Sequence, residues 1–128
     1  MQIIAVGIDL IETARIARQL RAGNKRFLAR VFTRAEAAYC LSMARPAQHL
    51  AARFAAKEAV MKALRTGWAK GVGWTQIEIR RGKDGAPALR LAGAAAKRAK
   101  ALRIRKWLVS LTHAEGIAAA ITIGVGRR

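Results

Sequence analysis

Two carboxylates stand at positions where an acid is either costly or useful. Asp9 directly follows residues 2–8, an apolar segment rich in β-branched side chains that predicts a buried strand. Glu58 lies at the edge of the apolar stripe of a long helix predicted over residues 47–64. Two carboxylates with water are a common way to hold Mg²⁺, because substrate phosphates complete its octahedral coordination. The pair therefore indicates a magnesium site for a phosphorylated substrate, whose charge nearby Lys and Arg side chains would neutralise.

Structural interpretations of the same residues also stay open. Asp9 could cap a helix that begins at Leu10. Lys57, near the middle of the apolar stripe, could pair with Glu58 at the rim of the helix while its stem covers apolar surface. Such a pair is geometrically poor, because adjacent residues on a helix do not face each other. Since a charge inside an apolar stripe is costly unless it is paired or used, the two acids together favour the metal site.

The charge balance is strongly basic, with 25 Lys and Arg against 7 Asp and Glu among 128 residues and a formal net charge of +18. Nucleic acid, an acidic protein or a polyanionic small molecule would each complement this charge. A compositional bias toward arginine explains part of it. The hydrophobic content of 53% indicates a folded core rather than a disordered basic tail, and the length predicts a single domain over residues 1–128.

The single cysteine, Cys40, excludes an intrachain disulfide framework and a multi-cysteine zinc site. It favours a reducing compartment. The longest apolar run, residues 116–126, is shorter than the ~18 residues of a membrane helix and predicts a buried strand instead. The N-terminus lacks the basic segment before an apolar stretch that a secretory signal would have. We therefore expect a cytoplasmic protein without a membrane partner.

The order of the expected elements favours an α+β fold. A helix over residues 10–22 would present Arg15, Arg18 and Arg21 on one face. Thr33 and Glu36 form a capping-box pattern that opens a helix over residues 34–43. The remaining predicted helices cover residues 25–31, 47–64 and 93–102, and the remaining predicted strands cover residues 74–81, 87–91, 106–113 and 117–125. The last two strands form an antiparallel hairpin, and the alanine-rich helix over residues 47–64 is expected to be largely buried.

Four segments together resemble the holo-acyl-carrier-protein synthases, the short 4′-phosphopantetheinyl transferases. Residues 6–12 (VGIDLIE) resemble the first signature of the family, and residues 53–64 (RFAAKEAVMKAL) are similar to its second. The glycine-containing stretch of residues 66–74 and the Ser-Leu-Thr-His of residues 110–113 resemble two later elements. The resemblance covers essentially the whole chain, and the pairing of Gly-x-Asp with Phe-x-x-Lys-Glu-x-x-x-Lys makes it specific.

The resemblance implies that the protein moves the phosphopantetheine arm of coenzyme A onto a serine hydroxyl of an apo acyl carrier protein. The other product would be adenosine 3′,5′-bisphosphate, in a Mg²⁺-dependent reaction of fatty-acid biosynthesis. The implied fold is a small antiparallel-rich sheet wrapped around a long buried helix. The resemblance also implies a homotrimer with active sites between subunits, and an acidic carrier protein rather than nucleic acid as the partner.

Position by position, the resemblance assigns roles to individual residues. Asp9 and Glu58 match the metal ligands, and Lys62 matches a lysine near the transferred phosphate. Arg53 and His113 match positions near the nucleotide and 3′-phosphate of the coenzyme. The further candidate coenzyme-binding residues are Arg45, Thr66 and Gly67. The candidate carrier-docking residues, on the basic helix face, are Arg15, Arg18 and Arg21.

Some alternatives remain within and beyond this family. The base that deprotonates the serine is open among a metal-bound water, Glu58 or Asp9 through water, and Lys62. Arg65 stands where the family usually has glycine, and Thr112 where it usually has a second serine. A basic nucleic-acid-binding module is a competing hypothesis, although the chain lacks zinc-finger spacing and only 5% of its residues are aromatic. A metal-dependent phosphate-ester hydrolase would use the same acids.

Overall fold

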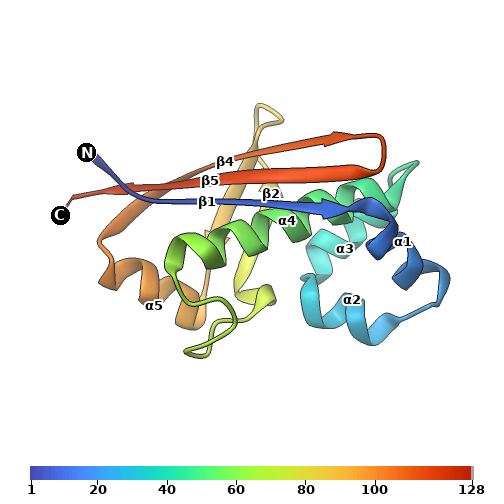
Figure 1. Cartoon of the computed structure of the whole chain (residues 1–128), viewed down its shortest axis with the longest axis horizontal. Coiled ribbons are helices and arrows are strands. Elements are labelled where there is room, and N and C mark those ends of the chain that lie inside the picture. The colour runs from blue at the N-terminus through green and yellow to red at the C-terminus, as the bar shows by residue number, and fades with distance from the viewer. Residues whose placement is uncertain (128) are drawn as a thin grey trace.

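Helix α4 (Pro46–Leu64) runs through the centre of the computed structural model, which describes residues 1–127 (Figure 1). Twelve of its 19 residues are buried, which confirms the expected burial of this helix. Pro46 occupies the first turn, where its missing N–H is not needed for an intrahelical bond. None of the helices within residues 1–127 is long and apolar enough to cross a membrane.

Within residues 1–127, the other elements form two antiparallel sheets and four shorter helices (Figure 1). Strands β1 (Gln2–Glu12), β4 (Ile104–Ala114) and β5 (Ile117–Gly126) form one sheet in the order β1-β5-β4. Strands β2 (Ile77–Arg81) and β3 (Pro87–Leu91) form a separate hairpin. The helices are α1 (Thr13–Arg21), α2 (Lys25–Val31), α3 (Arg34–Leu41) and α5 (Gly93–Ala101). The expected α+β fold, with antiparallel sheets around a long helix, is confirmed.

The first strand is longer than predicted. β1 continues to Glu12, so Asp9 lies inside the strand, opposite Ala120 of β5, rather than beyond its end. Helix α1 accordingly begins at Thr13, and Glu12 occupies its N-cap position. The alternative role of Asp9 as a helix cap is therefore wrong. The strand extends because β5 supplies ladder partners as far as Ile117, which lies opposite Glu12.

The inner face of the three-stranded sheet carries small side chains that let it approach α4 closely. Ala5 and Gly7 of β1 and Ala118 and Ala120 of β5 are buried there. Gly7 marks the closest approach, because a Cβ built at this position would lie only 1.8 Å from the carbonyl oxygen of Ala59. A glycine inside a strand often marks such an approach between two backbones. Gly7 therefore sets where β1 crosses α4.

The outer face of the same sheet is apolar and exposed, whereas the helices lie on its inner side (Figure 1). The outward side chains of β1 each keep more than half of their surface exposed: Ile3, Val6, Ile8 and Leu10. Further exposed side chains on the sheet are Leu108 of β4 and Ile117 and Ile121 of β5. The prediction of buried strands over residues 2–8 and 116–126 is therefore wrong for one face of each. An exposed apolar surface of this kind is typical of an interface.

A buried ion pair joins α4 to α3 and to strand β2. Lys57 Nζ lies 2.7 Å from Glu36 Oε1, and both side chains are fully buried. The ammonium also donates hydrogen bonds to the carbonyls of Trp74 and Ile77, while Glu36 Oε2 accepts one from the N–H of Ile79. Burial lowers the pKa of Lys57, and the nearby carboxylate of Glu36 opposes that shift. Every strong donor and acceptor of the pair is thus used to hold three elements together.

Glu36 reaches Lys57 because the first turn of α3 holds it in place. The predicted capping box is confirmed, since Thr33 Oγ1 accepts from the N–H of Glu36 and Glu36 Oε1 accepts from the N–H of Thr33 at 2.9 Å. The alternative in which Lys57 pairs with Glu58 at the rim of α4 is wrong, because Lys57 is fully buried and its partner is on another helix. The periodicity of a single helix contains no information on such a partner.

Replacing Gly7 with alanine tests the crossing of β1 and α4. The added methyl group would overlap the carbonyl oxygen of Ala59, so we expect the free energy of unfolding to fall by about 3 kcal/mol. Urea denaturation followed by circular dichroism measures this change. Gly73→Ala is the matched control, because Gly73 has a φ of −130° and open space around its Cβ position. Equal stability of the two variants would contradict the role of Gly7.

Replacing Lys57 with methionine tests the buried ion pair. The variant would leave Glu36 buried without its counter-charge, so we expect a loss of about 3–5 kcal/mol in the free energy of unfolding. The double variant Lys57→Met/Glu36→Gln should recover part of that loss, because it removes both charges. As a control, Lys62→Met should cost less than about 1 kcal/mol, since the Lys62 side chain is 56% exposed. Comparable losses for the two single variants would argue against this account.

Candidate active site

Asp9 and Lys62 meet beside the crossing of β1 and α4. Asp9 lies two residues beyond Gly7 and therefore on the same face of the strand. Lys62 lies one turn along α4 from Glu58. Lys62 Nζ lies 2.9 Å from Asp9 Oδ1 and donates a second hydrogen bond to the carbonyl of Ile8 at 3.0 Å. The structure thus brings together two candidate catalytic residues that are 53 positions apart in the chain.

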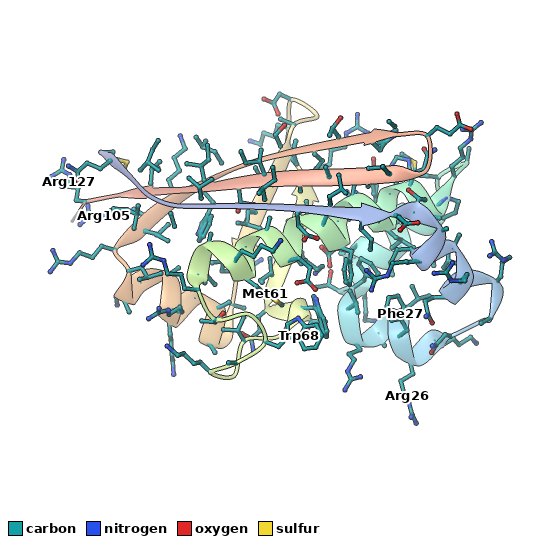
Figure 2. All side chains as sticks on the ribbon, in the orientation of Figure 1. Arg26, Phe27, Met61, Trp68, Arg105 and Arg127 are labelled. Atoms are coloured by element: carbon teal, nitrogen blue, oxygen red, sulfur yellow. The ribbon has the colours of Figure 1, made fainter. Side chains whose placement is uncertain are left out.

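Glu58 is contacted by an indole that the sequence analysis did not single out. Trp74 Nε1 donates a hydrogen bond to Glu58 Oε1 at 3.4 Å. The ring of Trp74 stacks on Phe54 and touches Trp68, whose position in the loop below α4 is labelled in Figure 2. The predicted strand over residues 74–81 begins only at Ile77, because residues 74–76 form a 3-10 turn. No spacing pattern connects this turn with Glu58, so only the fold could reveal the contact.

We use the name carboxylate cluster for Asp9 and Lys62, which are in contact, together with Glu58, which lies one turn before Lys62 on α4. The donor chemistry of its two carboxylates fits a hard divalent cation. Two carboxylates offer the oxygen ligands that Mg²⁺ prefers. Asp9 Oδ1 already accepts a hydrogen bond from the positively charged ammonium of Lys62. Within residues 1–127, no three or more His, Cys, Asp or Glu side chains gather closely enough to hold a metal ion by themselves. A Mg²⁺ ion here would therefore take most of its ligands from water and substrate, which is usual for this ion.

A second group, which we call the arginine–histidine cluster, consists of Tyr39, His49, Arg53 and His113. The guanidinium of Arg53, only 7% exposed, lies 4.7 Å from the centre of the Tyr39 ring. The ring of His49 packs edge-on against both Tyr39 and His113. Burial lowers the pKa of His49, and the positive charge of Arg53 adds to this shift. The structure thus places two candidate coenzyme-binding residues, Arg53 and His113, in one group.

Arg53 also lines a basic cavity beside the β2–β3 hairpin. The cavity has a volume of about 250 Å³ and is lined by Tyr39, Arg53, Arg80 and Arg81 among others. Arg53 Nε is buried and has no hydrogen-bond partner within residues 1–127. A buried donor without a partner costs about 1–3 kcal/mol, so this atom suits an anionic ligand. Arg45 lies at the N-terminal boundary of α4 and is exposed.

The carboxylate cluster and the arginine–histidine cluster lie on different sides of α4. Arg53 and Glu58 are five residues apart on α4, so their side chains point about 140° apart around the helix axis. Lys62 lies on the side of Glu58, and His49 lies on the side of Arg53, because each pair is four residues apart. A ligand that touches both clusters must bend around α4 or lie between two copies of the chain.

Helix α4 ends at a residue with left-handed backbone. Arg65 has a φ of 61°, and the N–H groups of Arg65 and Thr66 bond back to the carbonyls of Lys62 and Met61, which is a Schellman motif. Glycine adopts this conformation without a Cβ penalty, which explains the glycine usual here in the family that the sequence resembles. Thr66 is buried and donates its hydroxyl proton to the carbonyl of Gly67. Thr66 and Gly67 therefore directly follow the turn that carries Lys62.

The candidate carrier-docking residues lie on α1. Arg15, Arg18 and Arg21 are all exposed, and none forms an ion pair within the part of the chain that the structure describes. They recur every three residues, so their side chains spread over about 120° of the helix surface. The opposite side of the helix buries Ile16. The arrangement leaves a continuous positive face toward solvent.

Comparison with known proteins connects this geometry to a family. A family model described as the 4′-phosphopantetheinyl transferase superfamily matches residues 5–122. The holo-[acyl-carrier-protein] synthase of Moorella thermoacetica is 47% identical over 120 residues, which cover 94% of this chain and 92% of that protein. The crystal structure of the synthase from Neisseria meningitidis has a TM-score of 0.86 and 28% identity, with 97% of this chain and 99% of that chain covered. The synthase from Helicobacter pylori, in complex with coenzyme A, has a TM-score of 0.81 and 28% identity, with 94% and 99% covered.

Proposed function

Because the chain belongs to the 4′-phosphopantetheinyl transferase superfamily, we propose that it is a holo-[acyl-carrier-protein] synthase of fatty-acid biosynthesis. It transfers 4′-phosphopantetheine from coenzyme A to a serine hydroxyl of an apo acyl carrier protein and releases adenosine 3′,5′-bisphosphate. The observation that carries this proposal is the contact of Asp9 with Lys62, because it joins the two segments that resemble the family signatures. We place the reaction in the cytoplasm, where the single cysteine, Cys40, remains a free thiol.

The chemistry follows from where charge develops in the reaction. The serine oxygen forms a bond to phosphorus and gives its proton to a nearby base or water as the pyrophosphate bond breaks, so negative charge grows on the leaving phosphate. Asp9 and Glu58 would hold Mg²⁺, which as a bound ion supplies neutralisation of that charge. The ammonium of Lys62 adds a second positive charge beside the phosphate. Since the transition state of phosphoryl transfer is loose, positioning and charge neutralisation contribute more than early removal of the serine proton.

The arginine–histidine cluster would bind the nucleotide end of the coenzyme. That end is anionic, and Arg53 Nε is a buried donor without a partner in the described part of the chain. Arg80 and Arg81 add positive charge to the same cavity. Arginine suits this task because its planar fork can donate two hydrogen bonds to one phosphate. Arg45, Thr66 and Gly67 are the further coenzyme contacts that we propose.

The partner protein would dock on α1. Carrier proteins of this pathway are acidic, and the exposed face of Arg15, Arg18 and Arg21 offers the complementary charge. Opposite charges on two proteins speed their encounter, and salt screens this effect. The proposed Michaelis complex therefore forms more slowly as ionic strength rises.

We propose that the active protein is a homotrimer with active sites between copies. Two observations support association. The exposed apolar side chains of β1, β4 and β5 form a face that water disfavours. The two clusters on α4 also point away from each other, so a coenzyme molecule lying between copies could take the carboxylate cluster from one and the arginine–histidine cluster from its neighbour.

A transfer assay tests the proposed reaction. Incubation with coenzyme A, Mg²⁺ and an apo acyl carrier protein should add one phosphopantetheine group to the carrier, measured by intact-protein mass spectrometry. Chelation of Mg²⁺ should stop the reaction, and Asp9→Asn and Glu58→Gln should each lower turnover by about 100-fold or more without loss of helix content. A folded protein that modifies none of several acidic carriers would falsify the proposal. Cleavage of phosphate esters without any carrier would favour the hydrolase.

Complementation between variants tests the position of the active site. Glu58→Gln and Arg53→Gln should each be nearly inactive alone. Mixed trimers purified through both tags should regain about a third of the wild-type activity, because one of the three interfaces in each mixed trimer combines an intact Glu58 with an intact Arg53 from the neighbour. The measurement uses differently tagged copies, purified through both tags, with each single variant as the control. No recovery in mixed assemblies would place both residues of one site in one chain.

A further inference from the structure

Lys62 holds the carboxylate to which the proposed function assigns a divalent cation. Its ammonium binds two oxygens of β1, Asp9 Oδ1 at 2.9 Å and the carbonyl of Ile8 at 3.0 Å. Because the crossing of β1 and α4 is set at Gly7, both acceptors lie within reach of the last turns of α4. The ammonium of Lys62 thus takes the position beside Asp9 that a small cation would take, in close contact with two oxygen atoms.

We propose that Lys62 and a divalent metal ion compete for Asp9, so that binding of the metal releases the lysine toward the phosphate of the substrate. The proposal rests on the proposed function only in assigning a metal ion to Asp9. Two cations on one carboxylate would lie within about 4 Å of each other, where like charges repel strongly near a protein surface. Lys62 is therefore a competitor of the metal ion in the free protein and a group that contacts substrate once the metal ion is bound.

The exposure of Lys62 allows this exchange. Its side chain is 56% exposed, so the ammonium can leave Asp9 for solvent without any repacking. The aspartate is 17% exposed, so water reaches both partners of this ion pair, which makes the pair weak enough to be replaced. Lys57, five residues earlier on the same helix, shows the contrast, because it is fully buried and bound to Glu36 and two carbonyls. Of these two lysines, only Lys62 can be exchanged for another cation.

The exchange couples the metal to the coenzyme. Within residues 1–127, Asp9 is the acidic partner of Lys62, so a lysine displaced from Asp9 has an unpaired charge. A phosphate oxygen of the coenzyme is then its natural acceptor. Metal and coenzyme should therefore each favour the binding of the other, since each removes a competitor for the same two groups.

Metal binding by the free protein tests the competition. Mn²⁺ is the probe, and electron paramagnetic resonance measures free Mn²⁺ in the absence of coenzyme and carrier. We expect Lys62→Gln to bind Mn²⁺ about three- to tenfold more tightly than the unmodified chain, because the competing cation is gone. Lys62→Arg keeps a cation at this position and should stay within about twofold of the unmodified chain. Circular dichroism confirms that each variant is folded.

Two controls separate competition from a general effect of charge. Arg65→Gln removes the same charge three residues farther along the chain, at a residue that makes no ion pair with Asp9, and should change the Mn²⁺ affinity less than about twofold. In the Asp9→Asn background, Lys62→Gln should no longer tighten Mn²⁺ binding. Unchanged or weaker binding by Lys62→Gln, equal tightening by Arg65→Gln, or no Mn²⁺ binding by any variant would each overturn the proposal.

This result is independent of the transfer assay. If the unmodified protein transfers phosphopantetheine but Lys62→Gln leaves the Mn²⁺ affinity unchanged, the proposed function stands and the proposed competition between Lys62 and the metal ion is contradicted. If Lys62→Gln binds Mn²⁺ more tightly but the unmodified protein modifies no carrier, the competition is supported and the proposed function is contradicted.

Discussion

The contact between β1 and α4 at Gly7 is the constraint on which the candidate site depends. Because the strand backbone touches the helix backbone at Ala59, the next inward residue, Asp9, lies beside the turn that carries Glu58 and Lys62. A side chain at position 7 would hold the strand away from the helix by at least the width of a methyl group. The spacing Gly-x-Asp is therefore a geometric requirement: the glycine makes the contact, and the aspartate two residues later uses it.

The opposite side of α4 is held by a different kind of interaction. The pair of Glu36 and Lys57 fixes α3 and the start of β2 against the helix, and Glu36 and Arg53 line a second cavity there. A buried ion pair is a poor source of stability, because removing two charges from water offsets their attraction. The ion pair instead fixes how α3, α4 and β2 are arranged relative to one another, since its atoms bond to groups on all three elements. Helix α4 thus carries one buried and fixed ion pair, Glu36–Lys57, and one partly exposed and exchangeable ion pair, Asp9–Lys62.

Local patterns in the sequence predicted most of the fold. The capping box at Thr33, the proline at position 46 and the alternating strands each depend on neighbours within a few residues, so their elements lie close to the predicted bounds. Local patterns end β1 too early, because pairing with β5, more than 100 positions away, extends the strand through Asp9. The same limit applies to the site. Spacing indicated Asp9, Glu58 and Lys62, whereas the contact of Trp74 with Glu58 exists only once a distant turn has packed on α4.

The apolar outer face of the three-stranded sheet also bears on how the stability of this protein is to be understood. Side chains such as Ile8 and Leu10 remain 63% exposed in a single chain. Folding of an isolated chain therefore does not gain the favourable free energy of burying these apolar side chains. Where copies cover this face, the missing part is gained by association and follows mass action. The melting temperature of such a protein rises with its concentration. The cellular abundance of the chain then becomes one of the determinants of its folded lifetime, alongside the contacts within each copy.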